Sequence, residues 1–178
     1  MVKEFNTIDD FDVENKTVLV RIDINSPVDP GSGIILDDTR LKLHAQTIKE
    51  LSNKGAKVVL LAHQSRPGKQ DFTTLSQHAD ALSDILNLRV KYIDALFSNS
   101  AKEAIKSLKP HEILLLENAR FFSEETLSRT PEEQSKSLII RNLSPLIDYF
   151  INDTRSASWR ARGWRSSRWP RPAASAVP

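Results

Sequence analysis

The chain has 178 residues and no cysteine, which excludes disulfide bonds, thiol nucleophiles and thiolate metal sites. Its net charge of +2 conceals two compositions, because residues 154–178 hold six arginines and no acid while residues 1–153 hold the other 19 basic and all 23 acidic side chains. Neither a signal peptide nor an apolar run of the roughly 18 residues that a membrane helix needs is present, so we expect a cytoplasmic protein.

The first predicted strand is an apolar, β-branched run that begins at Val18 and ends near Pro27, which cannot donate a ladder hydrogen bond. Arg21, Asp23 and Asn25 lie two residues apart in this run. Because side chains alternate across a strand, the three polar groups share one side and leave the apolar residues between them for packing.

Further apolar runs alternate with amphipathic segments along residues 1–153. Apolar residues recur at helical spacing between Arg40 and Lys54, and Gly55 is placed to end that helix. The remaining expected elements are strands over 57–62, 90–93, 112–117 and 149–153 and helices over 74–86, over 99–108 and from Pro131 onward. This alternation predicts an α/β fold, a three-layer α/β sandwich with a parallel sheet.

Polar clusters follow the strongest strands and open the first helix. Their members are Asp23, Asn25, Arg40, His63, Arg66, Asn118 and Arg120. The carboxyl ends of parallel strands meet at one edge of a sheet, where open α/β sheets bind ligands. Guanidinium groups bind phosphate and carboxylate oxygens, and carboxylate and amide groups suit hydroxyls, so the set indicates a site for a small phosphorylated hydroxy acid. The alternative is that these side chains are solvated loop residues.

Other chemistries find less support in the sequence. No phosphate loop, nucleophile elbow or H-E-x-x-H helix is present, and we expect no metal site, taking Asp37 and Asp38 as helix-cap residues. His44 on the first helix is interpreted as a packing residue. His78 and His111 are interpreted as surface residues.

Four segments resemble, in order, the N-terminal domain motifs of phosphoglycerate kinase, most closely the archaeal type. They are Arg-Ile-Asp-Ile-Asn-Ser-Pro at 21–27, Asp-Thr-Arg at 38–40, His-Gln-Ser-Arg-Pro-Gly at 63–68 and Leu-Leu-Leu-Glu-Asn-Ala-Arg-Phe at 114–121. The resemblance implies a Rossmann-like domain over residues 1–153. Ser65 stands where most members have glycine, so we expect the loop to differ locally because serine disfavours positive φ.

The family moves a phosphoryl group between 1,3-bisphosphoglycerate and ADP, giving 3-phosphoglycerate and ATP in glycolysis. By motif position, the resemblance implies that Asp23 and Asn25 hold the glycerate, that His63, Arg66 and Arg120 form a basic patch around its phosphate and carboxylate, and that Arg40 is catalytic. Mg-ATP and Mg-ADP bind to the family's C-terminal domain. We therefore expect no cofactor-binding residue in this chain, a monomer, and no kinase activity without that domain.

The sequence of the tail at residues 154–178 differs from that of the family. Arg160 lies near the position of a family arginine, but the residues around it do not match the family sequence. We expect a truncated or frameshifted phosphoglycerate kinase after about residue 153, with a disordered Arg/Trp/Pro-rich tail. The alternative is a non-catalytic α/β module that binds a phosphometabolite or nucleic acid. Nucleic acid is disfavoured as a partner because the tail lacks hydrophobic periodicity and residues 1–153 are acidic.

Overall fold

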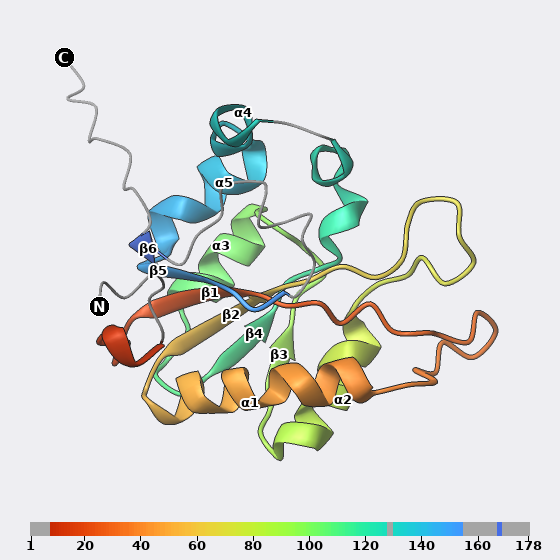
Figure 1. Cartoon of the computed structure of the whole chain (residues 1–178), viewed down its shortest axis with the longest axis horizontal. Coiled ribbons are helices and arrows are strands. Elements are labelled where there is room, and N and C mark those ends of the chain that lie inside the picture. The colour runs from red at the N-terminus through yellow and green to blue at the C-terminus, as the bar shows by residue number, and fades with distance from the viewer. Residues whose placement is uncertain (1–7, 128–129, 155–166, 169–178) are drawn as a thin grey trace, which may run out of the picture.

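A computed structural model describes residues 8–127, 130–154 and 167–168. A single six-stranded sheet with the order β3-β4-β2-β1-β5-β6 forms its centre (Figure 1). The strands are β1 (Thr17–Arg21), β2 (Lys57–Leu61), β3 (Val90–Tyr92), β4 (Ile113–Leu115), β5 (Tyr149–Asn152) and β6 (Ser167–Arg168). The five strands from β1 to β5 are parallel, which confirms the predicted parallel sheet, and β6 pairs antiparallel with β5.

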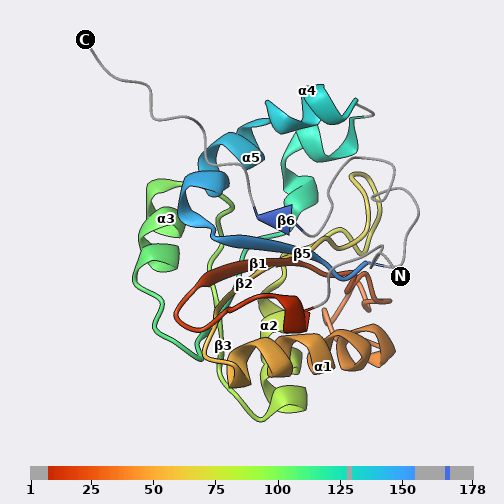
Figure 2. The ribbon, with the colours of Figure 1, turned by 60° about the vertical axis from the view of Figure 1, so that its left-hand side comes forward.

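Helices cover both faces of the sheet (Figures 1 and 2). They are α1 (Thr39–Asn53), α2 (Ser76–Leu86), α3 (Asn99–Lys106), α4 (Pro131–Ser135) and α5 (Leu138–Leu143), with short 3-10 helices at Ile8–Asp10, Ala119–Phe121, Ser123–Thr126 and Ser144–Leu146. Both α1 and α2 lie on one face, and α3 and α5 lie on the other. The molecule is therefore the three-layer α/β sandwich that the sequence predicts.

The two cores follow from the alternation of side chains along the strands. Val18 and Val20 of β1 pack with Leu41 and other residues of α1 and α2, whereas Leu19 packs with Ile105 of α3 and residues of α5. The same alternation occurs in β2 and β4. Strands buried on both faces explain why these segments read as continuous apolar runs.

The order of connections brings the carboxyl ends of β4, β2 and β1 side by side. The connections through α1 and α2 lead from β1 toward β3, and those through α3 and α5 lead back to β5 beyond β1. Reversing the direction together with the covered face keeps every crossover of one hand, as parallel sheets require. The loops that follow β1 and β2 extend from the same end of the sheet (Figure 1).

Several predicted boundaries shift by a few residues. Gly55 does end α1, with φ +78° and its N–H donating to the carbonyl of Ser52. The helix expected from Pro131 is two helices, because Ser137 accepts from the N–H of Ile140 and begins α5 separately. Apart from Thr154 and β6, the tail at 154–178 lies outside the described residues. Among the helices that the structure describes, none has the length and apolar content to cross a bilayer.

Candidate functional site

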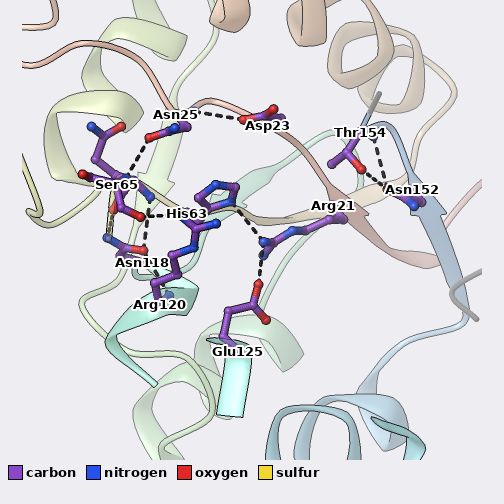
Figure 3. A network of polar contacts seen from close by, with 11 residues as sticks. Arg21, Asp23, Asn25, His63, Ser65, Asn118, Arg120, Glu125, Asn152 and Thr154 are labelled. Carbon is purple, nitrogen blue, oxygen red and sulfur yellow. Dashed lines mark hydrogen bonds and ion pairs between the residues drawn. The ribbon is translucent and has the colours of Figure 1, made fainter. Parts of the chain in front are cut away.

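The segments after β1, β2 and β4 form a polar rim at the carboxyl edge of the sheet (Figure 3). We define the rim as residues 21–27, 63–68 and 117–121, together with Arg40 at the start of α1. The three strands are neighbours in the sheet, which brings residues far apart in the sequence into one network. The rim contains all seven residues of the predicted polar clusters: Asp23, Asn25, Arg40, His63, Arg66, Asn118 and Arg120.

Asp23 and Arg40 form an ion pair across the gap between the β1 segment and α1. Arg40 Nη1 lies 2.6 Å from Asp23 Oδ2, and the Arg40 side chain is 50% exposed. The other carboxylate oxygen, Oδ1, accepts from the backbone N–H of Asn25 at 3.3 Å. The carboxylate thus fixes one branch of the guanidinium group and leaves half of this side chain open to solvent.

Asn25 fixes the loop after β2. Its Oδ1 accepts from the backbone N–H of Ser65 at 2.7 Å, which leaves the Nδ2 group as a donor. Ser65 has φ +54°, so serine takes the left-handed conformation that glycine would take with less strain. Its hydroxyl donates to Asp71 Oδ1 at 2.5 Å. This bond offsets part of the strain, so the loop keeps the positive φ that we expected serine to disfavour.

Asn118 and Gln64 join the loops after β4 and β2 and are fully buried. Asn118 Oδ1 accepts from the N–H groups of Gln64 and Arg120, and its Nδ2 donates to the carbonyls of Gln64 and Thr73. Gln64 in turn bonds both the N–H and the carbonyl of Ser26. These amides hold the backbone of the rim in place.

Arg66 and Arg120 contribute positive charge from two neighbouring loops. Arg66 is exposed on the loop after β2, whereas Arg120 is partly buried and its Nη1 donates to the carbonyl of Ser65. Burial lowers the pKa of Arg120, and the charges of Arg21 and Arg66 act in the same direction. An arginine keeps its charge nonetheless, so both side chains remain cations at the rim.

His63 is buried and neutral among these cations. Burial is the main cause that lowers the pKa of His63, the positive charges of Arg21, Arg120, Arg40 and Arg66 act in the same direction, and together they bring it to about 2. Its Nδ1 lies 3.2 Å from Arg21 Nη2, which can only donate, so Nδ1 accepts and the proton is assigned to Nε2. His63 is therefore a neutral side chain in a region of positive charge, and it does not add a charge to the predicted basic patch.

Arg21 is a buried residue that supports the loops of the rim, and the sequence did not predict this role. It is fully buried, and its Nη2 forms a 2.7 Å ion pair with Glu125 Oε1, whose side chain is also buried. Figure 3 shows Arg21 between His63 and Glu125. Since 104 positions separate Arg21 from Glu125, no local pattern could have predicted their pairing.

The interpretation of His78 as a surface residue is wrong. His78 is fully buried in α2, and its Nε2 lies 3.2 Å from Gln64 Oε1. Its burial follows from helical spacing, because Leu75 and Leu82 lie three residues before and four residues after it on the buried face. His111, in contrast, is exposed as expected.

His44 is buried in α1, and it also forms two hydrogen bonds that the packing interpretation did not include. Its Nε2 accepts from the backbone N–H of Asp23 at 3.2 Å, and its Nδ1 lies 2.8 Å from Asp153 Oδ2. The three residues come from α1, from the segment after β1 and from the segment after β5. His44 therefore ties the start of α1 to the rim.

The rim is suited to binding an anion. It presents exposed or half-exposed guanidinium groups beside a carboxylate and an amide donor, which together can bind phosphate, carboxylate and hydroxyl oxygens. Within the described ranges, no group of three or more His, Cys, Asp or Glu side chains could hold a metal ion. Of the two residues predicted to cap the first helix, Asp37 accepts from the N–H of Thr39 through Oδ1, whereas Asp38 occupies the N-cap position without a side-chain capping bond and pairs with Lys42 instead.

Known proteins resemble this chain in both sequence and fold. A phosphoglycerate kinase from Methanobacterium bryantii is 63% identical over 158 residues, which are 89% of this chain and 39% of that protein. One from Methanothermobacter thermautotrophicus is 60% identical over 159 residues with the same two shares. The crystal structure of phosphoglycerate kinase from Pyrococcus horikoshii OT3 matches with a TM-score of 0.80 and 43% identity over 83% of this chain and 36% of that one.

The residues that match the family model, 8–164, include the whole rim. They also extend past residue 153, where we expected the domain to end, and that domain boundary remains a prediction. The chain spans about 39% of the length of the two relatives. The family model described as phosphoglycerate kinase matches residues 8–164, and the chain therefore belongs to the phosphoglycerate kinase family.

Proposed function

We propose that this chain is the phosphoglycerate-binding part of a phosphoglycerate kinase and that the rim binds 3-phosphoglycerate or 1,3-bisphosphoglycerate. In this proposal Asp23 and Asn25 contact the glycerate, and His63, Arg66 and Arg120 surround its phosphate and carboxylate. One observation carries the proposal: Arg120 bonds the carbonyl of Ser65, which places it beside Arg66, and both cations share the carboxyl edge of the sheet with the half-exposed Arg40. A ligand with two anionic ends would offset that concentration of charge.

Arg40 is proposed to act on the phosphoryl group in transfer. Its pairing with Asp23 orients one branch of the guanidinium, and the half-exposed remainder can face a phosphoryl oxygen. Phosphoryl transfer depends on positioning and on neutralising the charge spread over the phosphoryl oxygens. A fixed cation performs both tasks without giving up or taking a proton.

The second substrate of the proposed reaction is a nucleotide. The family uses nucleotide substrates. The described residues include no group of three or more acidic or histidine side chains that could hold a metal ion, so no step is assigned to Mg²⁺ here. We infer that Mg-ATP and Mg-ADP are bound by groups outside this chain. On the resemblance alone, the proposal takes the protein to be a cytoplasmic monomer.

Calorimetric titration of the chain with 3-phosphoglycerate tests the proposal. Arg66→Ala and Arg120→Ala should each weaken binding by roughly tenfold or more, because a hydrogen bond to a charged group contributes about 1.5–3 kcal/mol. Binding should also weaken with added salt. Arg89→Ala is the matched control, since Arg89 is exposed just before β3, at the opposite edge of the sheet.

Two results would contradict the proposal. One is an unchanged dissociation constant in both rim variants. The other is equal weakening by Arg89→Ala, which would show a general effect of net charge rather than a site at the rim.

A further inference from the structure

His44 links three segments that meet beside the rim. It lies on α1 one turn after Arg40, bonds the backbone of Asp23 through Nε2, and bonds Asp153 through Nδ1. Its side chain is only 10% exposed, so both bonds are largely shielded from water. Asp153 is itself fixed to β1, because its backbone N–H donates to the carbonyl of Arg21 at 2.9 Å.

The two bonds define one form of the imidazole ring. The backbone N–H of Asp23 can only donate, so Nε2 must be the accepting nitrogen. The proton then lies on Nδ1, where it is donated to the carboxylate of Asp153. A neutral ring with its proton on Nδ1 satisfies both neighbours, and the carboxylate fixes that tautomer.

His44 and Arg40 together hold Asp23 at two points. His44 fixes the backbone of Asp23, and Arg40 pairs with the carboxylate at 2.6 Å. Because His44 and Arg40 are on the same helix, these contacts close a loop between the first turns of α1 and the segment after β1. A shift of Asp23 away from His44 would move the carboxylate that orients Arg40.

We propose that His44 is a positioning residue that keeps the Arg40 guanidinium oriented through Asp23, and that its accepting Nε2 is the atom responsible. The orientation of Arg40 can be measured without a ligand, so this part of the proposal does not depend on what the rim binds. The consequence for ligand binding rests on the proposed function of the rim.

Two substitutions separate the bonds of His44. The amide of His44→Gln reaches the place of Nε2 and can accept from Asp23, whereas the shorter amide of His44→Asn reaches the place of Nδ1 and can donate only to Asp153. His44→Gln loses the stronger bond, to the carboxylate of Asp153 at 2.8 Å, and His44→Asn loses the weaker, neutral bond from Asp23 at 3.2 Å. A purely structural role therefore predicts the larger effect in His44→Gln. A role through Asp23 predicts that only His44→Asn loosens Arg40.

The test uses the full chain labelled with ¹⁵N and follows the Nε–H signal of Arg40 and the amide of Asp23. We expect an ordered Arg40 signal in the wild type and in His44→Gln, and a mobile one in His44→Asn together with faster hydrogen exchange at Asp23. Urea unfolding of each variant measures the change in global stability. An ordered Arg40 in His44→Asn would overturn the proposal, and so would equal loss of order in both variants.

A titration with 3-phosphoglycerate then measures the consequence. His44→Asn should weaken binding about three- to tenfold, the effect of losing one neutral hydrogen bond, and His44→Gln by less than about twofold. Equal affinity of the two variants would overturn the link to the ligand. If the wild type does not bind, the proposed function fails while the order of Arg40 still decides the role of His44.

Discussion

Replacing Glu125 with alanine should destabilise the fold strongly, because it would leave the buried charge of Arg21 without its carboxylate. The two side chains are 1% and 4% exposed, and their closest atoms are 2.7 Å apart. Removing one partner of such a buried pair costs about 3–5 kcal/mol. The total free energy of unfolding of a domain is about 5–15 kcal/mol, so this loss is a large fraction of it.

Urea unfolding followed by circular dichroism measures the effect. A loss of about 3–5 kcal/mol should lower the urea midpoint by about 1 M or more, since the slope is about 1–3 kcal/mol per molar for small proteins. Glu103→Ala is the matched control, because Glu103 pairs with Lys106 while the two side chains are 73% and 57% exposed. That exposed pair should contribute less than about 1 kcal/mol.

Removing both charges should restore part of the lost stability. Replacing Arg21 and Glu125 together with methionine and leucine removes both charges, so the double variant should be closer in stability to the wild type than Glu125→Ala is. Equal midpoints for Glu125→Ala and Glu103→Ala would refute the argument. A double variant less stable than the single one would show that Arg21 stabilises the fold through its other contacts.

Three more predictions concern strain, pH and activity. Ser65→Ala keeps the strained φ of +54° and loses the bond to Asp71, so its urea midpoint should lie below that of Ser65→Gly. Burial lowers the pKa of His78 from 6.5 to about 4, so as the pH falls the unfolded chain takes up the proton before the folded chain does. The free energy of unfolding should therefore fall by about 1 kcal/mol per pH unit from pH 6.5 down to pH 4. Urea unfolding at several pH values measures this slope, which should be smaller in His78→Gln. With ATP and 3-phosphoglycerate the chain alone should release no ADP above an Arg40→Ala control, because an unpositioned nucleotide loses roughly 7–11 kcal/mol of proximity; turnover that is absent from the control would refute this.

The layers of the fold could be predicted because each element depends on a local pattern. Val18, Leu19 and Val20 are buried on alternate faces, and Leu41 and Ile48 of α1 recur at helical spacing. The short elements were less predictable. Strand β1 ends at Arg21, several residues before Pro27. After one more backbone bond, from Ile22 to Leu61, the N–H groups of Asp23 and Ser26 bond the side chains of His44 and Gln64.

The residues of the candidate site could be proposed by type from the sequence, but the network that joins them could not. Parallel topology alone is enough to gather Asp23, His63 and Arg120 at one edge. The partners of these residues come from distant segments, as with Arg21 and Glu125, and no spacing in the sequence records such contacts. His78 shows a different kind of error, because the helical pattern already contained the information that the interpretation of a surface residue overlooked.

The rim contains three amide side chains, those of Asn25, Gln64 and Asn118. Their hydrogen bonds show which of them hold the loops together and which can bind a ligand. An amide side chain can accept two hydrogen bonds and donate two. Asn118 and Gln64 each make all four with protein groups, so neither has capacity left for a ligand. Asn25 uses its oxygen for Ser65 and still has the Nδ2 donor. If the rim binds phosphoglycerate, Asn25 is therefore the amide that contacts it, and substitution of Asn118 should act through the shape of the loops instead.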